Sequence, residues 1–176
     1  MRQITVTPYN QEWIKQFQLE ALKLKEIFGH EIVEVFHIGS TAVPGLSAKP
    51  IIDMMPVVYD ITRIDNYDEE MIKIGFKPKG ENGIQGRRYF QKGGDQRTHH
   101  VHVYGKGNKE IIRHLAFRNY LREHPEDAKR YGSLKEQLAI RFPFDIESYI
   151  SGKHDLALEI DKKALLWYRK GDLLHD

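Results

Sequence analysis

At 176 residues, the chain is long enough to bury one substantial hydrophobic core and short for two independent domains. Its 40% hydrophobic and 30% charged residues are typical of a globular protein and exclude a disordered or membrane-embedded chain. The formal net charge of +2 is too small to predict general nucleic-acid binding, and the absence of cysteine excludes disulfides and thiolate chemistry. Because no stretch approaches the roughly 18 apolar residues of a membrane span, we expect a cytoplasmic protein without a membrane partner.

The first half of the chain alternates strand-like and helical patterns. Apolar side chains recur at spacings of three to four from Trp13 onward, which predicts an amphipathic helix that Asn10 caps and Gly29 ends. The stretches 32–38 and 51–58 are rich in β-branched and apolar residues and predict core strands, the second buried on both faces. In chain order the predicted elements are a strand at 4–7, a helix at 11–28, strands at 32–38 and 51–58, and a helix at 60–73.

The second half changes from short strands to helices. Strand-like pieces separated by glycines predict a meander that completes a mixed sheet. The predicted strands cover 76–79, 87–91 and 98–104, and the predicted helices cover 111–122, 125–140 and 146–168, the last with a break at Gly152. The fold class is therefore α+β (α/β), with one domain over 1–176 that divides into an α/β core at 1–107 and C-terminal helices at 108–176.

The loop from Gly39 to Gly45 joins two predicted core strands. Glycine after a strand allows a tight turn and the close approach of a ligand, and consecutive backbone N–H groups in such a turn form an anion-binding nest. Ser40 and Thr41 add hydroxyls, although the loop lacks the Walker A layout that ends in Gly-Lys-Ser/Thr. Two interpretations stay open, a phosphate-binding turn and a tight connection whose glycines serve geometry only.

Asp53 is an acidic residue within the apolar stretch 51–58. Burying a carboxylate without compensation costs several kcal/mol, so such a residue is usually paired, hydrogen-bonded or metal-bound. Asp53 is therefore a candidate metal ligand, and the alternative is a structural pair with Lys49 or a histidine.

Histidines alternate with valines in the predicted strand 98–104. Strand periodicity places His100 and His102 on one face and two buried valines on the other. Two imidazoles and the carboxylate of Asp53 form a ligand set for Zn²⁺, Mn²⁺ or Fe²⁺. Cupins and two-histidine phosphoesterases also carry such pairs, but here a Lys-Gly pair replaces the cupin glutamate, a second His-x-Thr/Ser is absent, and the helical C-terminus fits neither architecture.

Basic side chains supply candidate phosphate ligands. Arg88 lies in the strand before the histidines and could bind a phosphate bidentately. Lys135 and Lys153 follow apolar positions on inward-facing turns of predicted helices, whereas the other helical cations are typical of a solvated face.

Together these stretches resemble the GrpB family (UPF0157). The motifs that carry the resemblance are His37-Ile-Gly-Ser-Thr-Ala-Val-Pro-Gly-Leu-Ser-Ala-Lys-Pro-Ile-Ile-Asp53, Gly86-Arg-Arg-Tyr-Phe90, His99-His-Val-His-Val103, Arg113-His-Leu-Ala-Phe-Arg118 and Leu134-Lys135. The family is related to the polymerase-beta-type nucleotidyltransferase superfamily and also occurs as a domain appended to some dephospho-coenzyme A kinases. The resemblance spans nearly the whole chain and implies a nucleotidyltransferase-like mixed β-sheet flanked by helices, with a helical C-terminal portion.

The superfamily pattern is a Gly-Gly/Ser turn, then Asp-x-Asp/Glu on a strand, then a third acid on a later strand. Carried onto this chain, Gly39-Ser40 is the turn and Asp53 is the first acid. Met55 occupies the place of the second acid, which leaves the two-metal arrangement incomplete. The histidine pair lies where the third acid is expected.

The resemblance therefore predicts a nucleotidyltransferase-like protein that binds a nucleotide or another phosphorylated small molecule with a divalent metal, Mg²⁺, Mn²⁺ or Zn²⁺. Two alternatives stay open: a non-catalytic nucleotide- or coenzyme-binding module, which Met55 favours, and a metal-dependent phosphohydrolase that uses the histidine pair. The predicted catalytic residues are Asp53 and His102, the predicted metal ligands are Asp53, His100 and His102, and the predicted phosphate-binding residues are Gly39, Ser40, Thr41, Lys49, Arg88, Lys135 and Lys153.

Overall fold

The computed structural model describes residues 2–170 and divides the chain into two compact units. The sheet unit comprises Glu12–Ile38 and Ile51–Ile111, and the helical unit comprises Met1–Gln11, Gly39–Pro50 and Ile112–Asp176 within the described range. The loop that joins the first two strands thus belongs with the C-terminal helices rather than with the strands themselves.

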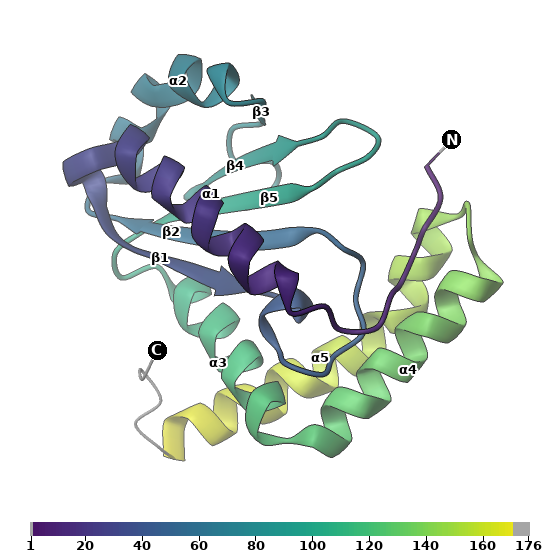
Figure 1. Cartoon of the computed structure of the whole chain (residues 1–176). Helices are drawn as coiled ribbons and strands as arrows, with labels where there is room; N and C mark the ends of the chain where they lie inside the picture. The colour runs from purple at the N-terminus through teal and green to yellow at the C-terminus, as the bar shows by residue number, and fades with distance from the viewer. Residues whose placement is uncertain (1, 171–176) are drawn as a thin grey trace. The chain divides into compact units, whose positions relative to one another are not determined.

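The sheet unit contains a five-stranded mixed sheet (Figure 1). Its strands are β1 (Ile32–Ile38), β2 (Ile52–Val58), β3 (Phe76–Pro78), β4 (Arg87–Lys92) and β5 (His99–Gly105), in the order β1-β2-β5-β4-β3. The β2–β5 pair is parallel, and the other three pairs are antiparallel. The predicted meander and mixed sheet are therefore confirmed, and β2 is buried along nearly its whole length between β1 and β5.

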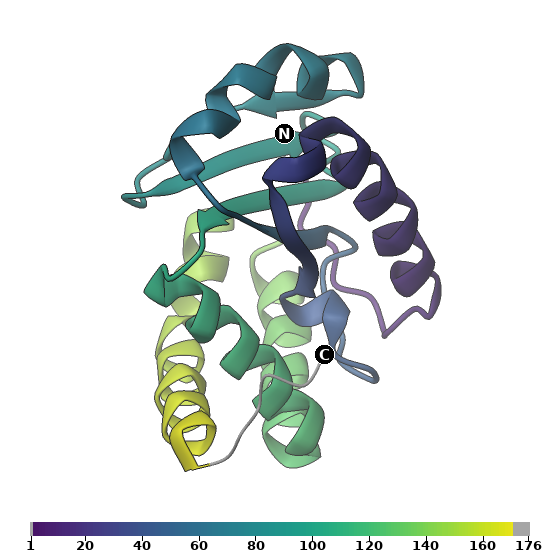
Figure 2. The same ribbon diagram turned by 90° about the vertical axis from the view of Figure 1, so that its left-hand side faces the viewer.

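Helix α1 (Glu12–Phe28) packs on β1 and β2 (Figures 1 and 2). Its amphipathic pattern explains this placement, since the buried side chains of Trp13, Leu24 and Phe28 share the face toward the strands. Phe17 stacks on the imidazole of His37 with ring centres 4.7 Å apart. His37 pairs with Met54, so α1 lies on the Met54 face of β2 and leaves the Asp53 face on the opposite side of the sheet.

Residues 60–73, predicted as one helix, form a 3₁₀ segment η3 (Ile61–Tyr67) followed by the short helix α2 (Asp68–Lys73). Asp60 caps the 3₁₀ segment by accepting from the Thr62 N–H at 3.0 Å. The predicted strand at 4–7 is also reduced, to a single bridge between Thr7 and Ala48.

The helical unit contains the helices α4 (Pro125–Arg141), α5 (Ile146–Lys170) and most of α3 (Lys109–Glu123). Helices α4 and α5 pack against each other, and the loop residues Val43 and Leu46 are buried with Ala116 and Ile160 in the core of this unit. No helix within residues 2–170 combines the length and the apolar character needed to cross a bilayer.

The predicted helix break at Gly152 is wrong, because α5 runs through this position without interruption. A Cβ at Gly152 would lie 2.5 Å from Leu138 Cδ2 of α4. The glycine therefore serves close helix–helix packing, not helix termination.

Candidate functional site

The strands β2 and β5 bring Asp53 together with the histidine pair. Asp53 pairs with His100 across the parallel ladder, and His102 follows two residues later on the same face. Asp53 Oδ1 lies 3.4 Å from His100 Nδ1 and 3.2 Å from His102 Nε2. The predicted face of the histidines is confirmed, since Val101 and Val103 on the other face are fully buried.

The Asp53 cluster, defined as Asp53, His100 and His102, is partly open to solvent. The exposed fractions of the three side chains are 30%, 18% and 15%. Burial alone would raise the pKa of Asp53, but hydrogen bonds from His100 and His102 outweigh this effect and hold the pKa of Asp53 well below its usual range. Asp53 is therefore a carboxylate at neutral pH and presents a fixed negative charge.

The donor set of the Asp53 cluster fits a divalent cation. One ligand atom from each residue lies within 4.8 Å of the others, a spacing that three ligands of one ion can adopt. A carboxylate oxygen with imidazole nitrogens suits Zn²⁺, Mn²⁺ or Fe²⁺ better than Mg²⁺. A contact between Arg87 Nη1 and His102 Nδ1, at 3.2 Å, restricts which nitrogen of His102 can take part.

Met55 lies on the same face of β2 as Asp53 and is fully buried. It pairs with Phe36 of β1. The place that the resemblance assigns to a second acid is therefore an apolar position, and the cluster holds one carboxylate where the two-metal arrangement needs more.

The helical unit holds the predicted phosphate-binding turn. Gly39 has φ 72° and ψ −170°, a backbone conformation that favours glycine, and Ser40 begins the 3₁₀ segment η2 (Ser40–Ala42). Lys135 Nζ donates to Ser40 Oγ at 2.8 Å and lies 4.7 Å from the ring centre of Tyr131. The hydrogen bond to Ser40 and the burial of Lys135, which is only 3% exposed, hold its ammonium at this turn. Thr41 is also buried.

Two further predicted lysines gather around Tyr149, which is fully buried in the same unit. Lys49 Nζ lies 5.1 Å and Lys153 Nζ 5.5 Å from the centre of its ring. Both distances are in the range of cation–π interactions. Burial and the neighbouring Tyr131 raise the pKa of Tyr149, so its hydroxyl stays neutral. The helical unit thus contains six of the seven predicted phosphate-binding residues, of which Lys135 contacts Ser40, and Lys49 and Lys153 share the ring of Tyr149.

Arg88, the seventh, lies in the sheet unit on the face opposite the histidines. It pairs with Val103, and its guanidinium binds Asp65 through Nε–Oδ1 at 2.7 Å and Nη2–Oδ2 at 3.4 Å. The arginine on the histidine face is Arg87, which is not among the predicted site residues although it belongs to the same basic pair in the sequence. Only the β4–β5 register, in which Arg87 pairs with Tyr104, distinguishes the two neighbours.

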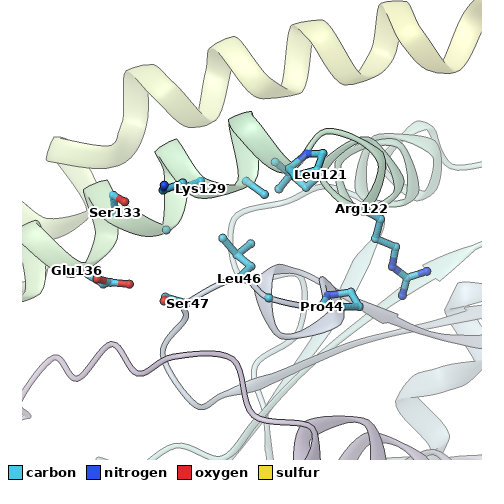
Figure 3. Close-up of a pocket in the computed structure, with 12 residues that line it drawn as sticks. Pro44, Leu46, Ser47, Leu121, Arg122, Lys129, Ser133 and Glu136 are labelled. Atoms are coloured by element: carbon cyan, nitrogen blue, oxygen red, sulfur yellow. The ribbon is translucent and has the colours of Figure 1, made fainter.

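A cavity of about 470 Å³ opens in the helical unit between α4 and the loop that contains Leu46 (Figure 3). Apolar Leu46 and Leu121 line it together with charged Arg122, Lys129 and Glu136. None of the predicted phosphate-binding residues is among the twelve residues that line this cavity. It is therefore separate from the Ser40–Lys135 contact.

Comparison with known proteins identifies the family. A family model described as GrpB protein matches residues 3–163. The UPF0157 protein YqkA of Bacillus subtilis (strain 168) is 50% identical over 170 residues, which cover 97% of this chain and 49% of that protein, so this chain spans about half the length of that relative. The crystal structure of the GrpB protein from Enterococcus faecalis matches with a TM-score of 0.91 at 48% identity and covers 93% of this chain and 99% of the other.

A distant likeness connects 73% of the chain to 45% of the Cid1 poly(U) polymerase in its MgATP-bound H336N form, with a TM-score of 0.48 and 16% identity. This likeness is too weak to carry an argument about activity. The predicted fold, a mixed sheet flanked by helices with a helical C-terminal portion, is confirmed by the structure and by its match to the Enterococcus protein. On the family match over most of its length and on this structural agreement, the chain belongs to the GrpB family.

Proposed function

We propose that this chain is a nucleotidyltransferase-like protein that binds a nucleotide or another phosphorylated small molecule together with a divalent cation. The observation that carries the proposal is the Asp53 cluster, in which an ionised carboxylate and two imidazoles converge from neighbouring strands. Asp53 and His100 are the residues proposed to hold the cation. The contact between Arg87 and His102 affects whether His102 can be a third ligand.

The phosphate group is proposed to bind in the helical unit at the turn that carries Ser40. Support comes from the buried ammonium of Lys135, 2.8 Å from Ser40 Oγ, and from Lys49 and Lys153 beside Tyr149. A buried ammonium beside a backbone turn provides charge-assisted donors for an anion. Arg88 is left out of this proposal because its guanidinium is bound to Asp65.

A non-catalytic binding module is the second candidate function, and buried Met55 favours it. A methionine on the Asp53 face cannot supply the second carboxylate that activates an attacking hydroxyl in a two-metal mechanism. Such a module would retain the cation and phosphate ligands and release no product.

Thermal unfolding of the purified protein across nucleoside triphosphates, a coenzyme A precursor and inorganic phosphate, each with Mg²⁺, Mn²⁺ or Zn²⁺, tests both candidates. Because a ligand that binds only the native state raises Tm, we expect a cation-dependent rise with at least one phosphorylated ligand. If no combination raises Tm, both binding functions are wrong.

Chemistry separates the candidates once a ligand is found. Incorporation of labelled nucleotide into an acceptor, with release of pyrophosphate, supports transfer, and release of inorganic phosphate without an acceptor supports hydrolysis instead. A ligand that binds and is recovered unchanged with every acceptor supports the non-catalytic module.

A further inference from the structure

Arg87 is held in place independently of the Asp53 cluster. Its Nε donates to the Glu81 carbonyl at 3.1 Å and its Nη2 donates to the Asn82 carbonyl at 2.8 Å. Asn82 has φ 47°, an uncommon conformation for a residue other than glycine, and this conformation is part of the turn that offers both carbonyls. The guanidinium also lies 4.8 Å from the ring centre of Tyr89, and Arg87 is only 6% exposed.

The third nitrogen of the guanidinium, Nη1, contacts the histidine. Arg87 Nη1 lies 3.2 Å from His102 Nδ1. A guanidinium has only donors and keeps its proton in proteins, so His102 Nδ1 must be the acceptor in this contact. In a neutral imidazole the proton then resides on Nε2, which lies 3.2 Å from Asp53 Oδ1 and donates to it.

This arrangement opposes metal binding by His102. A ligating imidazole nitrogen must be unprotonated, and its other ring N–H is ordinarily donated to a carboxylate or a carbonyl. If His102 Nε2 bound a cation, the proton would reside on Nδ1 and would face an Arg87 N–H at 3.2 Å, donor against donor. The fixed guanidinium therefore disfavours the tautomer that a metal requires.

We propose that Arg87 is a positioning residue that fixes His102 as the Nε2–H tautomer, so that His102 holds Asp53 by a hydrogen bond and does not ligate the cation. The chain Arg87–His102–Asp53 orients the carboxylate and leaves Asp53 and His100 as the protein ligands. The tautomer stands without the proposed function, whereas its consequence for the cation rests on the proposed cation site.

Nuclear magnetic resonance measures the tautomer directly in the unaltered, metal-free protein. Long-range ¹H–¹⁵N correlations distinguish the protonated from the unprotonated ring nitrogen, and His102, one of nine histidines, is assigned by the signal that vanishes in His102→Gln. At about pH 8, where an ordinary imidazole is neutral, we expect protonated Nε2 and unprotonated Nδ1. A protonated Nδ1 in the unaltered protein overturns the proposal.

Two substitutions of matched size then test the part of Arg87. Lysine at this position is still only a donor, while the carbonyl of glutamine can accept the Nδ1 proton. Both lose the fork and its contacts to the turn, so a merely structural effect would be similar in Arg87→Lys and Arg87→Gln. Arg88→Gln, on the opposite face, is the control for the loss of charge.

We expect Arg87→Lys to keep the Nε2–H tautomer and Arg87→Gln to populate Nδ1–H. Calorimetric titration with Zn²⁺ is expected to show roughly tenfold tighter binding in Arg87→Gln than in Arg87→Lys. Tenfold is the lower end of the effect that residues hydrogen-bonded to metal ligands have on metal affinity. Equal tautomers and equal Zn²⁺ affinities in folded proteins overturn the proposal. Nε2–H in the unaltered protein with no Zn²⁺ binding by any variant overturns the cation site and supports the assignment of His102 as a donor.

Discussion

The candidate site residues of the two units differ in charge and are held in place by different structural means. In the sheet unit, ladder pairing fixes Asp53 opposite His100, and the carboxylate contacts His100 and His102 of the neighbouring strand β5. In the helical unit, Lys135 is anchored by one hydroxyl and one aromatic ring, and two other lysines share the ring of Tyr149. We therefore expect cation binding to depend on the sheet unit and phosphate binding to depend on the helical unit, and substitutions can test the two separately.

Asp53→Asn should have the largest effect, because it removes the fixed negative charge of the sheet unit. Mutation of a residue that only hydrogen-bonds to a metal ligand weakens metal affinity by roughly ten- to hundredfold. Loss of the ligating carboxylate itself should therefore weaken cation binding by more than about a hundredfold. Calorimetry with Mn²⁺ measures this loss, and binding of inorganic phosphate without metal should be unchanged. Asp65→Asn is the control, since Asp65 binds Arg88 on the other face. Equal Mn²⁺ affinity in Asp53→Asn and the unaltered protein would contradict a cation site at Asp53.

Lys135→Met should produce the reverse pattern. A hydrogen bond to a charged group contributes about 1.5–3 kcal/mol, which corresponds to a loss of roughly ten- to hundredfold in phosphate affinity. Binding of Mn²⁺ alone should not change. Lys129→Met, an exposed lysine on the same helix that lines the separate cavity, should bind phosphate normally. An equal loss of phosphate affinity in both lysine variants would contradict a phosphate site at Lys135.

Gly152→Ala should destabilise the helical unit without touching the charged side chains. The added Cβ would lie 2.5 Å from Leu138 Cδ2, and relief of such overpacking typically costs about 1–3 kcal/mol. Chemical denaturation measures the change in the free energy of unfolding. The double variant Gly152→Ala, Leu138→Ala should lose less stability than the sum of the two single variants. Additive losses would mean that this close approach does not limit the packing of α5 on α4.

The pH dependence of stability should show the smallest effect. The pKa of Asp53 is lowered from its ordinary value of 3.8, so its contribution is fully present above that pH and is lost as the pH falls through the lower folded-state value. Because the side chain is 30% exposed, solvent screening limits the contribution to about 1 kcal/mol. Denaturation from neutral pH down to about pH 3 should show a smaller acid loss in Asp53→Asn than in the unaltered protein. An identical slope in both proteins would contradict the hydrogen bonds from the histidines.

Local patterns predicted most of the elements and the face of the histidines. Alternation of two is a property of one strand, so His100 and His102 could be placed opposite Val101 and Val103 without any partner strand. Spacing on the helices similarly predicted that Lys135 points inward, which its 3% exposure bears out.

Long-range pairing decided what the sequence could not. Arg87 and Arg88 are adjacent, and only the register between β4 and β5 determines which one shares a face with His102. Gly152 was predicted to break the helix because glycine disfavours a helix interior. Its actual role depends on Leu138 of another helix, which the local pattern does not show. Both cases required contacts between residues far apart in the chain or a register that no local pattern encodes.

Paramagnetic Mn²⁺ titration of the ¹⁵N-labelled protein tests the central claim, a cation site at Asp53, most directly. Mn²⁺ broadens the resonances of nuclei near the bound ion, so residue-specific broadening locates the site without any substitution. We predict that the amide resonances of Asp53, Met54 and His100 broaden first, well before those of Asp65 on the opposite face. Uniform broadening, or broadening that begins at another group of residues, would contradict a cation site at Asp53.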